Sequence, residues 1–441
     1  MIRRKLTGRR RALSLVAGCA SLLCLNILAA PPIPGNANRN QERSRASDHS
    51  RHREAPQARP VVTRKRNNGD ALLRDAERLR SEWTRESLRE ALKKYRLALP
   101  FFIKAGDKPG QAKTRLGTGE VLAILGQESG ALAQFLRAAP LASGDSRLQA
   151  DILNRLAEIE AGKNQRSCDD HARRALKLAE DSSYPAGQAD ALRNLGVLAR
   201  KEDDPEKAAE YHNRALEIYT AAGDPAGQAE ALTRLGLING DSGRVDAARR
   251  FFDRALAAAR QANDPRKEAR VNLAVALAFA ISAEWQKALD LYRKTLSLVR
   301  QLGDESLLMV ALNGLGSLYQ EMGDANAALA NFNESLAVSR TRRDTGNEAF
   351  ALGYIANIYA SNGRRHEGLA IYRRIIRIAL ASRDRRSEAY ALVDSGLVYE
   401  SLGNLAAARR CYVRAVKSGE STHHPRVSAY AHARASSDSA S

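Results

Sequence analysis

The stretch from Asp304 to Asp344, DESLLMVALNGLGSLYQEMGDANAALANFNESLAVSRTRRD, has the pattern of one helical hairpin. An apolar stripe in its first half repeats every three or four residues, which gathers side chains on one face only in a helix. The stripe consists of Leu308, Ala311, Leu312, Leu315 and Tyr319. After Met322-Gly323-Asp324, a second stripe follows at Ala328, Leu329, Phe332, Leu336 and Val338. This pattern predicts two helices that pack on each other and leave apolar edges for a neighbour.

The same template recurs along the chain. A small residue of the first helix falls at Gly117, Ala157, Gly196, Gly236, Ala276, Gly316, Ala356 and Gly396, with one spacing of 39 and the rest of 40. An aromatic residue of the second helix recurs at Phe252, Tyr292, Phe332, Tyr372 and Tyr412. Small residues and rings in a fixed register predict close packing between hairpins. Junctions such as Gly223-Asp224-Pro225 predict the end of one helix and the start of the next.

These residues resemble the tetratricopeptide repeat family. The family's first helix, with Leu-Gly and then an aromatic residue, is matched by Leu315-Gly316 and Tyr319. Its second helix, with alanines around an aromatic residue, is matched by Ala408, Tyr412 and Ala415. Family repeats are usually about 34 residues long, and the repeats of this chain are similar to a longer variety found in bacterial proteins.

The resemblance covers residues 70–423 and implies an all-α fold. We expect an α-solenoid, a right-handed superhelix of about nine antiparallel helical hairpins. The hairpins are expected to begin near residues 70, 107, 145, 184, 224, 264, 304, 344 and 384. Residues 424–441 are predicted to form a short cap, or a repeat that is cut short, with a disordered tail.

The first 30 residues have the composition of an export signal or membrane anchor. A basic head, MIRRKLTGRRR, precedes an apolar run from Ala12 to Ala30 that ends in small residues. This run of 19 residues is also long enough to stay in a membrane. Val16-Ala17-Gly18-Cys19 resembles a lipoprotein cleavage box, which would leave Cys19 lipidated. The sequence therefore predicts an exported bacterial protein, periplasmic or extracellular, that is cleaved, anchored or lipidated.

Residues 31–69 are rich in Pro, Asn, Arg and Ser and are predicted to form a disordered basic tether. Residues 1–69 contain 15 Lys and Arg against 3 Asp and Glu, a net charge of +12 out of +20 for the whole chain. The tether is either a solvated spacer or a segment attracted to anionic lipid or wall polymer. No basic face with interleaved aromatic residues and no nucleic-acid-binding module follows, so no nucleic-acid partner is expected.

The repeats contain no recognisable catalytic or metal-binding motif. There is no GxxxxGK[ST] phosphate loop and no HExxH, and His366-Glu367 lacks a second histidine. Cys168 and Cys411 lie about six hairpins apart, beyond the reach of a disulfide in a solenoid. We therefore expect no cofactor, no metal site and no enzyme activity.

In the tetratricopeptide family, the first helices line a concave groove that binds peptides or proteins. The resemblance places ten polar residues of this chain in that groove. They are Arg193, Asn194, Arg200, Arg234, Asn313, Gln320, Tyr354, Asn357, Asp394 and Glu400. They imply a non-catalytic protein-interaction scaffold of the cell envelope, with a protein or peptide ligand in the groove.

A second interpretation comes from the segment AERLRSEWTRESLREALKKYRLALPFF that leads the array. With the export head and the long repeats, it resembles the repeat region of bacterial proteins that carry a caspase-like CHAT peptidase domain. The chain would then be the regulatory or recognition part of such a peptidase, whose catalytic domain is absent from this chain. No catalytic residue is transferred by this resemblance.

Overall fold

A computed structural model describes residues 60–82, 84–161, 165–420 and 434. The described residues form eighteen α-helices and one short 3₁₀ helix, as the all-α prediction requires. They divide into two compact units. Unit 1 comprises the described residues up to Ile281 together with Leu298–Asp304, and unit 2 comprises Ser282–Ser297 together with the described residues from Glu305 onward. Each unit is an all-α solenoid segment, and the right-handed superhelical course stays a prediction.

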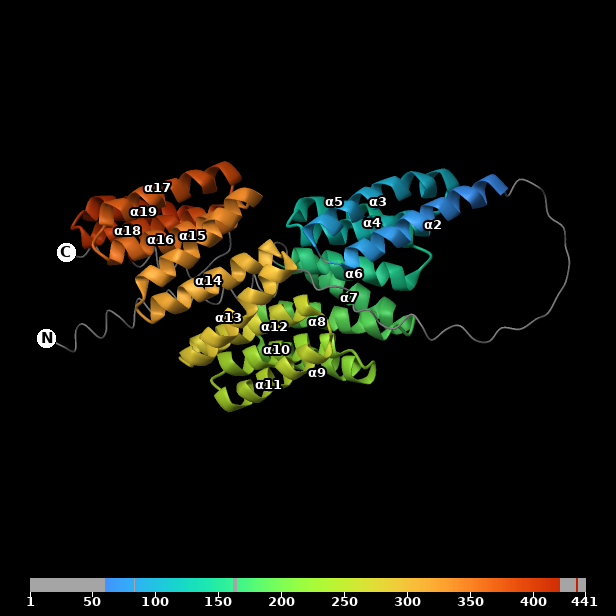
Figure 1. The fold of residues 1–441 in the computed structure, drawn as a ribbon, viewed down its shortest axis with the longest axis horizontal. Coiled ribbons are helices and arrows are strands. Elements are labelled where there is room, and N and C mark those ends of the chain that lie inside the picture. The colour runs from blue at the N-terminus through green and yellow to red at the C-terminus, as the bar shows by residue number, and fades with distance from the viewer. Residues whose placement is uncertain (1–59, 83, 162–164, 421–433, 435–441) are drawn as a thin grey trace. The chain divides into compact units, whose positions relative to one another are not determined.

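Unit 1 contains successive helical hairpins in chain order (Figure 1). Its helices are α2 (Pro60–Ser81), α3 (Arg85–Ala105), α4 (Lys108–Ile124), α5 (Glu128–Ala138), the 3₁₀ helix η1 (Ala139–Ala142), α6 (Ser146–Glu160), α7 (Gln165–Asp181), α8 (Pro185–Lys201), α9 (Pro205–Ala221), α10 (Pro225–Asp241), α11 (Val245–Gln261) and α12 (Pro265–Ile281). The first helices α2, α4, α6, α8 and α10 each pack on their second helix, and each second helix from α3 to α11 packs on the next first helix.

Unit 2 continues the same order of helices. Helix α13 (Trp285–Leu302) is divided between the units after Ser297. It is followed by α14 (Glu305–Glu321), α15 (Ala325–Arg342), α16 (Thr345–Ser361), α17 (Arg365–Ser382), α18 (Arg385–Ser401) and α19 (Leu405–Glu420). The helix starts agree with all the predicted hairpin starts from residue 107 onward. The first hairpin begins earlier, because α2 starts at Pro60 and the predicted boundary at residue 69 falls inside this helix.

The junctions between helices are built as their sequence predicts. Gly106 ends α3 with φ +67°, and Asp107 accepts a hydrogen bond from the backbone N–H of Gly110 at 2.9 Å. Asp224 caps α10 in the same way, accepting from the backbone N–H of Gly227 at 3.1 Å. Side-chain acceptors satisfy N–H groups that have no partner within the first turn of a helix, so each Asp defines where a helix begins.

The regularly spaced small residues make room for aromatic rings. A Cβ atom on Gly236 would lie 2.4 Å from Cε1 of Phe252, so only glycine fits beside this ring. Gly396 has the same relation to Tyr412, and Gly196 has it to His212, which occupies the ring position in its repeat. These rings belong to the second helix of the same hairpin. The expectation that the registered glycines pack between hairpins is therefore wrong for these three, which close their own hairpins.

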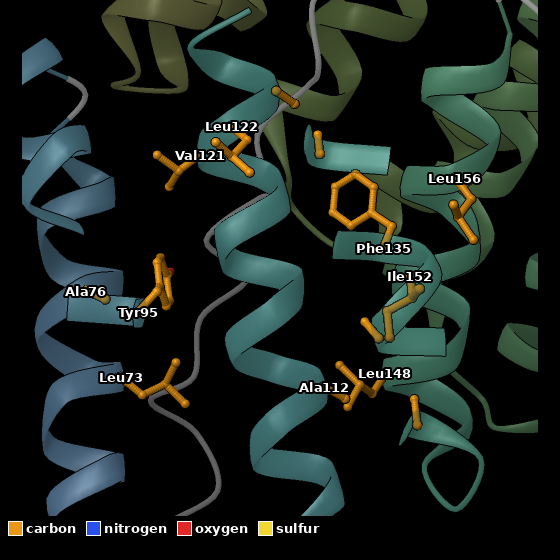
Figure 2. Packing of buried hydrophobic residues seen from close by; sticks show 14 of the residues in the cluster. Leu73, Ala76, Tyr95, Ala112, Val121, Leu122, Phe135, Leu148, Ile152 and Leu156 are labelled. Carbon is orange, nitrogen blue, oxygen red and sulfur yellow. The ribbon is translucent and has the colours of Figure 1, made fainter. Parts of the chain in front are cut away.

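In the core of unit 1, glycines face rings both within a hairpin and between hairpins (Figure 2). Tyr95 lies on one side of α4 and Phe135 on the other, and each ring is 1% exposed. Gly117 of α4 faces Tyr95, and Gly119 faces Phe135. Burying such rings removes a large apolar area from water, which stabilises the hairpin stack.

The predicted export segment (1–30), most of the tether (31–69) and nearly all of residues 424–441 lie outside the described residues. Arg434 is described, and its guanidinium forms an ion pair of 2.6 Å with Glu400. Within the described ranges, no helix has both the length and the apolar composition needed to cross a bilayer.

Candidate functional site

The ten residues assigned to the groove fall on first helices in both units. Arg193, Asn194, Arg200 and Arg234 belong to α8 and α10 of unit 1, whereas Asn313, Gln320, Tyr354, Asn357, Asp394 and Glu400 belong to α14, α16 and α18 of unit 2. Five of the ten are buried, with exposed fractions between 3% and 6%. They are Arg193, Asn194, Arg234, Asn313 and Tyr354. Little of these five side chains is therefore exposed to a ligand.

The unit 1 residues connect neighbouring hairpins. The side-chain amide of Asn194 donates a hydrogen bond to the carbonyl of Asn154 at 3.0 Å, and Asn154 donates to the carbonyl of Gly187 at 3.0 Å. Arg200 pairs with Asp241 at 2.6 Å, one repeat further along. These contacts satisfy polar groups between first helices and fix how the hairpins stack.

A row of alternating charges runs through the same helices. Arg155 of α6 donates to Glu158 at 2.8 Å and to Asp190 of α8 at 3.0 Å. Arg193 lies 3.6 Å from both Asp190 and Glu230, and Arg234 lies 3.4 Å from Glu230. We call this set the unit 1 charge ladder: Arg155, Glu158, Asp190, Arg193, Glu230 and Arg234. It links three successive first helices.

The charges of the ladder are set by their neighbours. Burial alone would raise the pKa of Glu230, but Arg193, Arg270 and Arg234 together lower it to about 2. Burial lowers the pKa of Arg234 to about 10, against the attraction of Glu230. His212 is 1% exposed, and burial lowers its pKa to about 3. At neutral pH Glu230 and Arg234 are thus ionised, while His212 is uncharged.

In unit 2 the polar side chains are more accessible. We call Gln320, Asn357, Asp394 and Glu400 the unit 2 polar face, in which Asn357 is exposed and the other three are half-buried. The face spans three first helices, since α14 contacts α16 and α16 contacts α18. All four side chains carry oxygen atoms that accept hydrogen bonds, and two of them are carboxyl groups.

An open space lies in this face at Gly353. A Cβ atom there would meet no atom within 4 Å. The positions in register on other first helices carry buried side chains, such as Asn313 and Val393. Gly353 thus leaves open space one turn before Asn357. Among the described residues, Oδ1 of the neighbouring Asn313 has no hydrogen-bond donor.

Hydrogen bonds hold the acceptors in place. The hydroxyl of Tyr372 donates to Oδ1 of Asn357 at 2.5 Å, and the hydroxyl of Tyr412 donates to Glu400 at 2.7 Å. Burial raises the pKa of Asp394 to about 7, although a hydrogen bond from Asn357 opposes the rise. Asp394 therefore gains its negative charge near neutral pH, and Glu400 already binds a guanidinium, that of Arg434.

Sequence reasoning missed two contributors to this site. Gly353 and the hydroxyl of Tyr372 were not assigned to the groove. Gly353 had one detectable signal, a glycine in the middle of a first helix at a position where the other repeats carry larger residues. Tyr372 had none, because its hydrogen bond to Asn357 depends on how neighbouring helices pack.

Models of the tetratricopeptide repeat match three parts of the chain. One matches residues 227–301 and 267–341, a second matches 191–226 and a third matches 389–418. The chain is a tetratricopeptide repeat protein. Its resemblance to the repeat region of CHAT proteins stays a prediction. The comparison with curated proteins gave no match for this repeat protein.

Solved structures include similar arrays. The Signal Transduction ATPase with Numerous Domains protein with a tetratricopeptide repeat sensor from Pyrococcus horikoshii has 17% identity and a TM-score of 0.53 over 74% of this repeat protein. The match covers 48% of the Pyrococcus protein, so the chain spans about half its length. The apo quorum sensor NprR from B. thuringiensis has 11% identity and a TM-score of 0.54, over 81% of this chain and 99% of NprR. At these identities the likeness concerns the fold.

Proposed function

We propose that this repeat protein is a non-catalytic scaffold that binds an extended, basic peptide segment of a partner protein across the unit 2 polar face. The observation that carries the proposal is the open space at Gly353, which lies in register with buried Asn313 and one turn from exposed Asn357. An extended backbone presents N–H groups in a row, and the amide oxygens of this face are suited to accept from them.

The charge of the face favours lysine or arginine in the ligand. First helices α14, α16 and α18 carry six acidic and two basic side chains. Glu305, Glu348 and Glu388 are paired with arginines of unit 2. Asp394 and Glu400 are the two carboxyl groups of the polar face, and the Arg434 contact shows that Glu400 accepts a guanidinium. A charge-assisted hydrogen bond of this kind is roughly twice as strong as a neutral one.

The size of the face limits the ligand. Neighbouring helices pack roughly 8 to 10 Å apart, so three first helices span about 20 Å. An extended chain covers that distance with about six residues. The expected ligand is therefore a short linear segment. The buried unit 1 charge ladder stabilises the array in this proposal, and Arg193, Asn194 and Arg234 are outside the binding site.

The proposal is tested with an array of ten-residue peptides of systematically varied charge, probed with the labelled full chain. Peptides with Lys or Arg should be enriched over neutral and acidic ones. The double variant Asp394→Asn with Glu400→Gln should weaken binding of an enriched peptide by about tenfold or more, since a hydrogen bond to a charged group contributes about 1.5 to 3 kcal/mol.

The matched control is Glu217→Gln with Asp253→Asn, which removes two exposed carboxylates from second helices of unit 1. This variant should bind as the wild type does. Enrichment of acidic peptides, or an equal loss in both double variants, would contradict the proposal.

Location at the cell envelope is part of the proposal and is supported by the basic head and apolar run of residues 1–30. Fractionation of cells that express the full chain or the chain without residues 1–30 tests it. The full chain should be found outside the cytoplasm and the shortened chain within it. Recovery of the full chain in the cytoplasm would contradict a location at the cell envelope.

A further inference from the structure

The second helices of unit 2 present exposed stripes that combine basic and apolar side chains. On α17, Arg373, Arg377 and Leu380 follow one another at intervals of four and three residues, which aligns them on one side of the helix. On α19, Arg410, Val413 and Lys417 do the same at intervals of three and four. All six side chains are exposed, and Leu380 and Val413 are 47% and 42% exposed. We call these six residues the basic face.

The cations of this face are available for a partner. Arg374 and Arg414, which lie beside the stripes, are engaged by Glu348 and Glu388 of first helices. Among the described residues, no acidic side chain forms an ion pair with Arg373, Arg377, Arg410 or Lys417. Both α17 and α19 pack on the same first helix, α18.

The charge is a property of these helices and not of the repeat architecture. Helices α17 and α19 together carry eight Lys and Arg against two Glu, whereas the equivalent helices α7 and α9 carry six basic against seven acidic residues. In α9, the positions in register with the α17 stripe are Asn213, Glu217 and Thr220. The second helices thus differ in charge within one fold: α7 and α9 are nearly neutral, whereas α17 and α19 are basic, as are α3 and α11 of unit 1.

We infer that the basic face docks on the surface of a bilayer that contains anionic phospholipid. Lysine and arginine side chains attract acidic headgroups, and apolar side chains between them can enter the headgroup region. The inference goes beyond the proposed peptide site, which lies on the first helices of the same unit.

Two features favour lipid over nucleic acid. Stacking platforms for bases need exposed rings, but Tyr372 and Tyr412 of these helices are 0% and 3% exposed. The same chain also carries a net charge of +12 in residues 1–69, around an apolar run long enough for a membrane anchor. The basic face thus gives the chain a second membrane contact, in addition to the one predicted for its N-terminal segment.

The test uses the full chain and measures, at one chosen residue, whether that residue enters the bilayer. An environment-sensitive fluorescent amino acid is placed at Val413, and in a control chain at Val245, which is 48% exposed on α11 of unit 1. Each chain is mixed with vesicles of phosphatidylcholine alone or with equal amounts of phosphatidylglycerol, with brominated lipid as quencher. Membrane binding through residues 1–69 alone brings neither probe into the bilayer.

We expect quenching at Val413 only with phosphatidylglycerol, and none at Val245. Arg373→Gln, Arg377→Gln and Lys417→Gln combined should raise the lipid concentration for half-maximal quenching on the order of 100-fold, from about 1 kcal/mol for each cation near an anionic surface. The control triple variant Arg250→Gln, Arg254→Gln and Arg260→Gln on α11 should change it far less.

Three results would overturn the inference. They are equal quenching at both positions, quenching that does not need phosphatidylglycerol, and a response of the Val413 probe to double-stranded DNA with none to vesicles. The last result would show that the basic face binds a nucleic acid or a similar polyanion and not a lipid surface. Failure of the peptide test leaves this measurement unaffected, because the two sites share no residue.

Discussion

Two glycines in unit 2 should respond in opposite directions to the same substitution. Gly396 lies in the middle of α18 against the ring of Tyr412, and an added Cβ would lie 2.4, 2.8 and 2.9 Å from three ring atoms. Carbon atoms prefer to be about 3.5 to 4.0 Å apart. The ring cannot move away freely, because it is 3% exposed and its hydroxyl donates to Glu400. Gly353, in the middle of α16, has open space where an added Cβ would lie.

The magnitudes follow from two terms. Replacing Gly by Ala in a helix is favourable by about 1 kcal/mol, and overpacking a core costs about 1 to 3 kcal/mol. Gly353→Ala receives only the first term and should stabilise the protein by about 1 kcal/mol. Gly396→Ala receives both and should be destabilising by about 0 to 2 kcal/mol. The difference between the variants, about 1 to 3 kcal/mol, isolates the steric clash because the helix term cancels.

The assay is urea unfolding followed by circular dichroism, with hydrogen exchange of α16, α18 and α19 measured in parallel. Exchange is needed because repeat arrays can unfold in parts, so a single transition can conceal a local change. Gly396→Ala should exchange faster in α18 and α19. Equal stability of the two alanine variants would refute the role of the glycine and ring pairs in closing each hairpin.

Three further predictions concern charge. The pKa of Asp394 is about 7, so its carboxylate forms as the pH rises through that value, and affinity for a basic peptide should increase there. In a fluorescence titration, Asp394→Asn should remove this increase. An increase in affinity that persists in the variant would contradict the assignment. Arg193→Met should cost about 3 to 5 kcal/mol in urea unfolding by leaving Glu230 buried with less compensation, and a cost below about 1 kcal/mol would show that the ladder is dispensable. The pKa of His212 is lowered to about 3, so below about pH 6.5 the unfolded chain takes up a proton that the folded chain does not. Stability should therefore fall as pH decreases from about 6.5 toward 3, and His212→Phe, which gives this repeat the ring found at Phe252, should flatten that fall in thermal unfolding; an unchanged profile would contradict the burial of a neutral imidazole.

The fold could be predicted because its determinants are local and repeated. Asp224 can be read as a helix cap from its neighbours Gly223 and Pro225, and the structure shows the hydrogen bonds of that cap. Gly236 and Phe252 recur in register as Gly316 and Phe332 and as Gly396 and Tyr412, so the same pairing closes several hairpins. The boundary at residue 69 was placed too late, because the polar composition of residues 60–69 gave no apolar stripe to mark the start of α2.

The binding site could be predicted only in part. A single helix shows which residues are polar, but it does not show which of them a neighbouring helix covers. Arg193 and Asn194 were for that reason assigned to an open groove, although partners 35 to 40 residues away in the chain bury them. Of the other residues assigned to the groove, Asn357 is exposed, and Asp394 and Glu400 are half-buried. How they lie relative to one another depends on the packing of α14, α16 and α18, which the sequence of a single helix does not show.

The measurement that tests the central claim most directly is photo-crosslinking of an enriched basic peptide to the full chain. A photoreactive amino acid is placed at Gly353, in the open space of the unit 2 polar face, and in a second chain at Ala370, which is exposed on α17. The account predicts a crosslink from position 353 that excess unlabelled peptide removes, and none from position 370. Crosslinking from position 370 with none from 353 would contradict binding on the first helices.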